Sequence, residues 1–553
     1  MVNEFRVLIF SSKPPAKLVR IVERIRRELP EVTGIAIVYE PLREKPLGRR
    51  VRGILGRISE PYYLAFVFDR SLRMFLRPIR RAGDAILRFL HAAPRNLNPR
   101  LASSFDDLQD FAKKNGIAIL LTNDLHSDES LAFVRKFRPD LGVIFGTKIL
   151  KPALYEIPRL GSINVHKKKV PDYRGGGPTG LWELLEGAKE IGITVHGVTT
   201  NLDGGPVLQR TTLRIDPYDR LESLALKADV VGNDLLIQTI RDMVKGTGSF
   251  QEQTGEARTF RNPSDHLLLA YRRELDQKLT PYDRPRGRPM WKLVLRSILL
   301  YPFLFFRNWN YRFRQSFPVI ILYHHLITDR PHHLGLPTSE FVRQVEFLRR
   351  HYHIASLPEA MQMLEAGRVK APTVVLTFDD GYAENYINLR AVTEEYRIPV
   401  FLFVSTAHMQ SQASFGHDRR REQSGFSPLS WEQVVVLHRA GFGFGSHTRT
   451  HFDCGSTDEV ALKSEIVDSK SELEGYLGES VDYFSFPWGM PANMSEPGKK
   501  LALQTYGYSY AAAGGINPPG MSTRQILRRC DHPPFVFDLE LLLQCVLEFD
   551  NRG

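Results

Sequence analysis

The sequence is poor in cysteine and has no long uninterrupted apolar run. Only three of its 553 residues are cysteines, too few for a disulfide framework, which suits a reducing compartment. The opening MVNEFRVLIFSSKPP lacks the basic region, long apolar run and cleavage site of a secretory signal, so we expect a cytoplasmic protein. The nearest approach to a membrane span, residues 293–306, is interrupted by Arg296 and Pro302 and is short for a bilayer.

Acidic residues are outnumbered by basic ones. There are 74 lysines and arginines against 62 aspartates and glutamates, a formal net charge of +12. The excess gathers in residues 43–57, 73–100 and 284–314. Such clusters attract nucleic acid, anionic lipid or phosphorylated substrates, although each can also be an ordinary solvated surface.

Two stretches of alternating strand-like and helix-like segments indicate two α/β domains. In the first half, strand-like RVLIF, IAILLT and LGVIFG alternate with helix-like segments such as LVRIVERIRREL, which favours a largely parallel sheet. A second such stretch starts at FPVIILYHH, and no internal repeat relates the halves. We predict a first domain over 1–245 with a basic insertion at about 43–104, a linker over 246–315 and a second domain over 316–553.

The first candidate site is an asparagine and a histidine two residues apart on a strand-like segment. In GSINVHKKKVPDYRGGGP, Asn164 and His166 occupy positions i and i+2, so both side chains face one side of the strand. Asp203 follows in the segment GITVHGVTTNLDGGPVL, before two glycines. The three residue types suit amine chemistry. His166 can act as a base toward an amine, Asn164 can donate a hydrogen bond to an oxyanion, and Asp203 can orient the imidazole.

These segments, together with PDLGVIFGTKILKPALYEIPRL, resemble the folate-dependent formyltransferases, which include methionyl-tRNA, glycinamide-ribonucleotide and sugar N-formyltransferases. The resemblance implies a Rossmann-like domain that transfers a formyl group from 10-formyltetrahydrofolate to an amine. It also implies the roles given above for Asn164, His166 and Asp203. A cofactor-binding segment around Phe145, Gly146 and Ile149 follows from the similarity of GTKIL.

The loop after the histidine departs from the family. It carries Lys167, Lys168 and Lys169 where small or apolar residues are common. The loop is either a mobile basic segment or a recognition element for a phosphorylated acceptor, and we favour the second. We therefore place Lys167 and Arg174 among the substrate-binding residues.

The second candidate site combines two adjacent carboxylates with two histidines. The apolar run in TVVLTFDDGY ends at Asp379 and Asp380, a pair that is costly to hold unless a cation or a proton relieves it. In GSHTRTH, His447 and His451 are at i and i+4, and on a helical turn they would share one face and bind one metal.

With FPWG at 486–489, these motifs resemble the polysaccharide deacetylases of the NodB type, which implies a deformed (β/α) barrel. The resemblance implies that Asp380, His447 and His451 bind a divalent metal, commonly zinc, and that Asp379 is the base for a metal-activated water. It also places Trp488 at the substrate, where its backbone N–H helps to hold the oxyanion.

The family's general-acid motif is not evident in the second half. His532 in ILRRCDHPP is the candidate that we name for the catalytic acid. His324 and His325 are alternatives, or else packed residues near the site.

Joined in one chain, the two activities suggest amide exchange on a nucleotide- or lipid-linked amino sugar of a bacterial surface glycan. The deacylase would remove an acetyl group and the transferase would formylate the freed amine. The alternatives are formylation followed by later deformylation, a deacetylase-like module that only binds, and, last, a tRNA-directed enzyme. The basic and aromatic segment 291–314 is either a helix packed between domains or a peripheral membrane contact.

Overall fold

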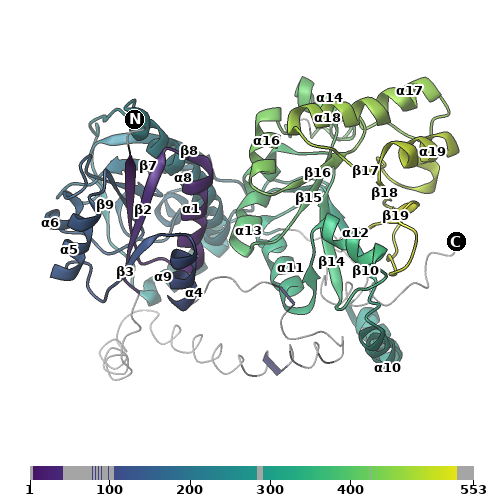
Figure 1. The fold of residues 1–553 in the computed structure, drawn as a ribbon, viewed down its shortest axis with the longest axis horizontal. Coiled ribbons are helices and arrows are strands. Elements are labelled where there is room, and N and C mark those ends of the chain that lie inside the picture. Colours follow the sequence, from purple (N-terminus) through teal and green to yellow (C-terminus); the bar gives the residue numbers. More distant parts are fainter. Residues whose placement is uncertain are drawn as a thin grey trace. The chain divides into compact units, whose positions relative to one another are not determined.

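The computed structural model describes residues 4–41, 105–282, 290–423 and 425–531, with seven isolated positions between 78 and 98. These residues form two compact units. The first contains the described residues up to 41 and 105–279, and the second contains 280–531 with the isolated positions (Figure 1). The predicted basic insertion lies almost entirely outside the described residues. The three domain boundaries drawn from the sequence stay a prediction.

The first unit is built on a seven-stranded sheet in the order β3-β2-β1-β4-β5-β7-β8. The five strands from β3 to β5 are parallel, and β7 and β8 extend the sheet antiparallel. The strands are β1 Phe5–Ser11, β2 Val32–Tyr39, β3 Ala118–Leu121, β4 Leu141–Phe145, β5 Ser162–His166, β7 Glu190–Gly197 and β8 Val207–Arg214. This parallel-rich sheet confirms the predicted Rossmann-like fold.

Helices cover both faces of this sheet, as continuous apolar strands such as VLIF require. The first core includes side chains from α1, α4 and α8, and the second from α5 and α6. The bounds are α1 Pro15–Glu28, α4 Phe105–Lys114, α5 Asp128–Phe137, α6 Pro152–Tyr155 and α8 Leu221–Lys245. Strand order reverses between β1 and β4, and open α/β sheets bind ligands beyond the carboxyl ends of the strands at such a point.

The second unit is built on a parallel sheet in the order β19-β18-β17-β16-β15-β14-β10-β20, with β13 also paired to β14. The first and last strands of that path are separated in the chain by one residue, Arg529, so the sheet nearly closes into a barrel. The strands are β10 Val319–His324, β13 His353–Ile354, β14 Thr373–Phe378, β15 Phe401–Val404, β16 Gly443–Ser446, β17 Tyr483–Ser485, β18 Tyr508–Ala511, β19 Ile526–Arg528 and β20 Cys530–Asp531. The predicted NodB-type deformed barrel is confirmed.

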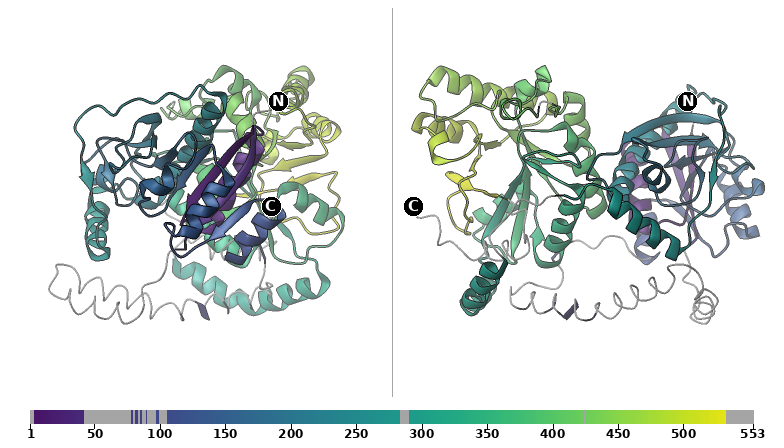
Figure 2. Two further views of the ribbon diagram at one scale, coloured as in Figure 1. Left: turned by 60° about the vertical axis from the view of Figure 1, so that its left-hand side comes forward. Right: turned by 180° about the vertical axis from the view of Figure 1, so that it is seen from behind.

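Helices flank this sheet on its outside (Figures 1 and 2). They are α11 Thr338–His351, α12 Leu357–Glu365, α13 Asn388–Tyr396, α16 Trp431–Arg439, α18 Ser469–Leu477 and α19 Glu496–Thr505. One core cluster joins α12 to side chains of β10, β14, β15, β18 and β19. Because the strands are parallel, their carboxyl ends and the loops that follow lie at one end of the barrel, where the second candidate site forms.

The segment 291–314 forms helix α10, Met290–Arg314, of the second unit. Its C-terminal part packs on the core of that unit through Trp309 and Tyr311. Five large apolar side chains of this helix are exposed at a spacing that puts them on one face: Leu295, Leu299, Phe303, Phe306 and Phe313. Among the described residues, no helix is both long and apolar enough to cross a bilayer.

Candidate active sites

The first site forms where β5 and β7 pair antiparallel. Asn164 and His166 lie on β5, and the register places His196 of β7 directly opposite Asn164. Asn164 Nδ2 is 3.3 Å from His196 Nε2. Asp203, in the turn between β7 and β8, lies 3.7 Å from His166 Nδ1 and 3.5 Å from His196 Nε2. The structure thus brings together the three residues that the sequence singled out and adds a second histidine.

The charge states of this cluster follow from its burial. Burial raises the pKa of Asp203, but His196, His166 and the backbone N–H of Gly175 outweigh it and lower that pKa to about 2. Burial lowers the pKa of His166, and the Asp203 carboxylate opposes that effect only in part. His166 Nε2 donates to the backbone carbonyl of Tyr173 at 3.0 Å. The site therefore holds an aspartate anion beside a neutral imidazole, which can accept a proton.

Asp203 is held by the loop that follows His166 and by Gln253. Gly175 N–H donates to Asp203 Oδ2 at 2.8 Å, and Gln253 Nε2 donates to the Asp203 carbonyl at 2.8 Å. Arg174 in turn donates to Gln253 Oε1 through Nε at 3.2 Å and Nη2 at 2.6 Å. The predicted substrate-binding residue Arg174 is therefore tied to the turn that carries Asp203.

The three lysines of the loop have different surroundings. Lys168 is buried, and its ammonium donates to the carbonyls of Gly175 and Gly176. These hydrogen bonds stabilise the conformation of the loop. Burial lowers the pKa of Lys168. Lys169 pairs with Asp172 at 3.1 Å.

Lys167 belongs to a separate basic cluster at the carboxyl end of the sheet. It contacts Asp229 of α8, which is also 2.7 Å from Lys17 and 3.9 Å from Lys13. Three lysine ammonium groups therefore converge on one carboxylate. The substrate-binding role of Lys167 stays a prediction, and the contribution of the segment after β1 was not predicted.

The predicted cofactor-binding segment lies at the point where strand order reverses. Phe145 ends β4, which pairs with both β1 and β5, and the Lys13 ammonium lies 4.3 Å from the centre of its ring. Gly146 has φ of 66°, a left-handed conformation that favours glycine. Ile149 is 76% exposed. An exposed apolar side chain beside a glycine turn, next to β5, suits the flat ring of a folate.

The second site forms at the carboxyl ends of β14 and β16. Asp380 follows β14, is fully buried and has φ of 68°. Its Oδ1 lies 3.2 Å from His451 Nε2 and 3.5 Å from His447 Nε2. His447 Nδ1 donates to the Ser485 carbonyl at 2.7 Å, which leaves the lone pair of Nε2 facing Asp380. Burial is the largest of the causes that lower the pKa of His447 to about 4.

This cluster fits a divalent metal. The ligand atoms of Asp380, His447 and His451 all lie within 4.8 Å of one another. Both oxygens of the buried Asp380 lack a well-aligned hydrogen-bond donor among the described residues, an arrangement that a cation would satisfy. One carboxylate and two imidazoles are a common zinc donor set that leaves a coordination position open.

The two histidines are not on a helical turn, so that part of the prediction is wrong. Strand β16 ends at Ser446, and the chain continues as an irregular loop. Thr448 and His451 have φ of 62° and 57°, and these left-handed residues turn the loop back on itself. The i, i+4 spacing brings the rings together through this turn instead of through helical periodicity.

Asp379 is held by an arginine that the sequence analysis did not identify. Arg529 donates to both carboxylate oxygens, at 2.7 and 2.8 Å, and to Ser485 Oγ at 2.6 Å. Both partners are buried. Burial raises the pKa of Asp379, but Arg529 and His447 outweigh it, so that pKa is lowered and the carboxylate is charged. The barrel therefore holds a charged carboxylate at a fixed position.

A cavity of about 570 Å³ opens onto both carboxylates. Its walls include Trp488, which is 44% exposed and whose ring centre lies 4.4 Å from that of His451. His325 also lines the cavity, whereas His324 is buried against Phe378, 4.9 Å between ring centres. His532, the named candidate for the acid, lies outside the described residues.

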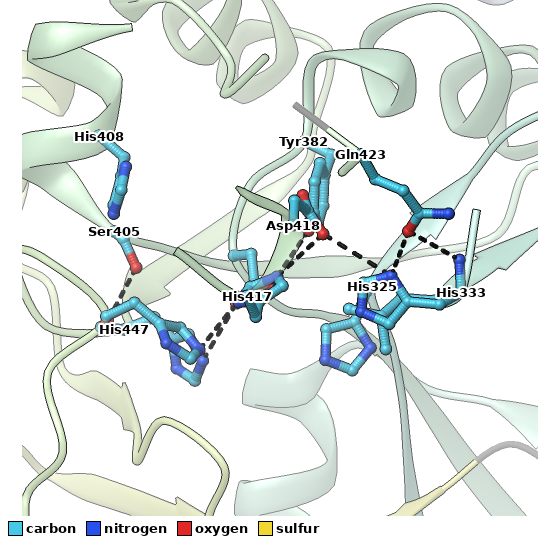
Figure 3. Close-up of polar contacts among 12 residues, drawn as sticks. His325, His333, Tyr382, Ser405, His408, His417, Asp418, Gln423 and His447 are labelled. Carbon is cyan, nitrogen blue, oxygen red and sulfur yellow. Dashed lines mark hydrogen bonds and ion pairs between the residues drawn. The ribbon is translucent and has the colours of Figure 1, made fainter. Parts of the chain in front are cut away.

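His417 is a further cavity residue that the sequence analysis missed. Its Nε2 is 3.5 Å from Asp380 Oδ2 and 2.8 Å from the Tyr382 hydroxyl. In Figure 3 its ring lies between His447 and Asp418. Burial, the largest cause, lowers the pKa of His417 to about 4. The run HDRRR at 417–421 was visible in the sequence, but nothing in it indicated proximity to TFDDGY.

Comparisons with known proteins match each unit separately. A formyl transferase model matches residues 92–240, and a polysaccharide deacetylase model matches residues 366–510. The methionyl-tRNA formyltransferase of Thermodesulfovibrio yellowstonii is 32% identical over 151 residues, 27% of this chain and 49% of that protein. The Bacillus subtilis methionyl-tRNA formyltransferase is 32% identical over 195 residues, 34% of this chain and 60% of that protein. The chain thus spans about half the length of these curated relatives.

Solved structures resemble both units. The Streptococcus pyogenes deacetylase PplD is 20% identical with a TM-score of 0.36, and the match covers 42% of this chain and 98% of that one. A sugar N-formyltransferase from a Shewanella species is 15% identical with a TM-score of 0.29, covering 46% of this chain and 76% of that one. From the two family models, the chain joins a formyl transferase domain to a polysaccharide deacetylase domain.

Proposed function

We propose that this protein is a cytoplasmic bifunctional enzyme that exchanges the acyl group on an amino sugar. One site hydrolyses an N-acetyl amide, and the other formylates the freed amine with 10-formyltetrahydrofolate. The observation that carries the proposal is that one chain contains both sets of site residues, one in each unit. His166 is held beside Asn164 by Asp203, and Asp379 is held by Arg529 beside the Asp380 cluster.

The first site supports formyl transfer to an amine. The folate supplies the activated formyl group. His166, neutral because it is buried, takes a proton from the amine as the nitrogen bonds to the formyl carbon. Asn164 donates a hydrogen bond to the oxygen that gains negative charge. Asp203 stabilises the imidazolium and returns to its resting contact when the proton leaves with the folate nitrogen.

The second site supports amide hydrolysis. A divalent ion held by Asp380, His447 and His451 would polarise the amide carbonyl and acidify a water molecule. Asp379, kept charged by Arg529, removes a proton from the attacking water. By resemblance to the deacetylase family, the Trp488 backbone N–H would stabilise the oxyanion, and Trp488 lines the cavity. Acetate leaves, and the amine remains on the sugar.

The basic cluster in the first unit supports a phosphorylated acceptor. Lys13, Lys17 and Lys167 surround Asp229 at the same edge of the sheet as the catalytic strand. Three lysines gathered beside the site favour an amino sugar on a nucleotide or lipid phosphate over an uncharged one. A tRNA acceptor is the competing candidate, because the curated relatives named above are methionyl-tRNA formyltransferases. A salt-dependent gel shift with tRNA tests it.

Mass spectrometry tests the exchange directly. Nucleotide-linked N-acetyl and free-amine sugars are incubated with the protein, zinc and 10-formyltetrahydrofolate. Exchange gives a product one methylene lighter than the N-acetyl substrate. Protein that removes formyl but never acetyl groups would support formylation followed by deformylation instead. Formylation of free amines with no hydrolysis of any amide would reduce the second unit to a binding module.

A further inference from the structure

The deacetylase cavity has a basic wall that the hydrolytic chemistry does not use. Arg420 and Arg421 line it, next to His417. The carboxylates among the described lining residues are Asp379 and Asp380. Arg529 neutralises the charge of Asp379, and Asp380 belongs to the cluster that would bind the metal. The two arginines, both solvent-exposed, therefore add positive charge to the cavity wall.

The turn that carries these arginines is anchored at both ends. Asp418 accepts hydrogen bonds from His332 Nε2 at 3.0 Å and from the Tyr382 hydroxyl at 2.7 Å. Gln423 Oε1 accepts from His333 Nδ1 at 2.5 Å. Figure 3 shows these contacts beside His417. Backbone N–H groups of Arg421 and Gln423 both donate to the Asp418 carbonyl at 2.9 Å. Because the backbone of this turn is already fixed, binding to Arg420 and Arg421 requires the ordering of their side chains but not of the turn itself.

The anchoring cluster of His332, His333 and Asp418 has a spacing that would also suit a metal. However, the Leu334 backbone N–H donates to His332 Nδ1 at 3.2 Å. The hydrogen of this imidazole must then be on Nε2, which donates to Asp418. That nitrogen has no lone pair to offer a cation. The cluster is therefore an anchor for the turn.

We propose that Arg420 and Arg421 form a phosphate subsite of the deacetylase cavity. Its ligand is the phosphate or diphosphate that links the acylated amino sugar to its carrier. Guanidinium groups pair with phosphate oxygens through charge-assisted and often bidentate hydrogen bonds. The cavity of about 570 Å³ is within the usual range of small-molecule sites and exceeds what an acetamido group alone requires. The deacylase then acts on a phosphate-linked sugar and discriminates against uncharged polysaccharide.

This inference rests on the proposed hydrolytic function, so its test compares substrates that differ only in the phosphate. The full-length zinc-loaded protein is assayed with an N-acetylamino sugar 1-phosphate and with the matching methyl glycoside. The variants are Arg420→Gln, Arg421→Gln and the double variant. Arg439→Gln is the matched control, because Arg439 is an exposed arginine on α16 that does not line the cavity. Bound zinc and thermal unfolding are measured for every variant.

We expect the wild-type protein to favour the phosphorylated substrate in kcat/KM. The double variant should lower that preference at least about tenfold, because charged hydrogen bonds to the phosphate are lost. The control should keep the wild-type preference. Equal kcat/KM values for both substrates in the wild type, or a double variant that keeps the preference, overturns the subsite. A nucleotide-linked and a polyprenyl-phosphate-linked substrate, compared in the same way, identify the carrier.

A second measurement separates failure of the subsite from failure of the hydrolytic function. Inorganic pyrophosphate is titrated by calorimetry into a His166→Ala/Lys167→Ala background, in which the acceptor cluster of the first unit is weakened. Binding that the Arg420/Arg421 double change weakens at least tenfold supports the subsite even if no amide is hydrolysed. Unchanged binding refutes it even if hydrolysis occurs.

Discussion

The ion pair between Arg529 and Asp379 should be the costliest interaction to break in the second unit. Both side chains are buried, and two hydrogen bonds of 2.7 and 2.8 Å join them. Removal of one partner leaves the other charge buried and unpaired, which costs about 3–5 kcal/mol. We therefore expect Arg529→Met and Asp379→Asn each to destabilise this unit by that amount. At about 2–4 °C per kcal/mol, its melting temperature should fall by roughly 6–20 °C.

The double variant Asp379→Asn/Arg529→Met tests the reasoning behind this number. It leaves no unpaired charge, so most of the penalty should be recovered, with a coupling energy of at least about 2 kcal/mol. Differential scanning calorimetry of the metal-free full-length chain measures the unfolding of the wild type, the two single variants and the double variant. The unfolding transition of the other unit serves as an internal reference. Arg439→Met is the control for loss of an exposed arginine. Additive penalties in the double variant would refute a direct pairing.

The stability that this ion pair contributes should depend on pH in a defined direction. The pKa of Asp379 is lowered in the folded protein, because Arg529 and His447 outweigh the effect of burial. A lowered carboxyl pKa contributes stability that is complete above the ordinary pKa of aspartate and is lost as the pH falls through the folded value. The difference in the free energy of unfolding between the wild type and Arg529→Met should therefore have its full value at neutral pH and should decrease only at acidic pH.

Three further predictions address the remaining sites. Asp203→Asn should slow formyl transfer by about 10²–10⁴-fold. It should also move the acidic limb of the pH–rate profile to lower pH, because the Asp203 carboxylate raises the pKa of His166 against the effect of burial. Release of tetrahydrofolate, measured as a function of pH, checks both effects. His451→Ala should lose stoichiometric metal by elemental analysis while the chain keeps formyl transfer to free amines. If the exposed face of α10 binds anionic lipid, Phe306→Asp should lower flotation with anionic liposomes, and a wild-type protein that stays in solution excludes membrane contact.

The local sequence was sufficient to predict the positions of site residues where a short motif coincides with a strand or its end. The apolar run TVVLTF predicted a buried strand with two carboxylates at its end, and β14 ends directly before Asp379. The i, i+2 spacing of Asn164 and His166 predicted that both side chains share one face of β5, and His166 lies 3.7 Å from Asp203 while Asn164 lies 3.3 Å from His196. In these cases periodicity alone decides the direction of the side chain.

The partners that fix these residues were beyond local sequence. His196 faces Asn164 only because β5 and β7 pair in one particular register, although both strands were recognisable in the sequence. The spacing of His447 and His451 suggested a helix, whereas two left-handed residues produce the same proximity in a loop. Lys168 was predicted to belong to a basic loop that is either mobile or recognises a phosphorylated acceptor, whereas it is buried and donates to glycine carbonyls.

Arg529 shows why the base of the second site depends on the whole barrel. It is 150 residues from Asp379 in the chain and lies between β19, which pairs with β18, and β20, which pairs with β10. The same short segment therefore brings the two ends of the sheet together and delivers the guanidinium group. In the unfolded chain, Asp379 is a solvated carboxylate that is already ionised at neutral pH. Closure of the barrel buries it, which alone would raise its pKa, and the same segment supplies the guanidinium group that keeps it charged.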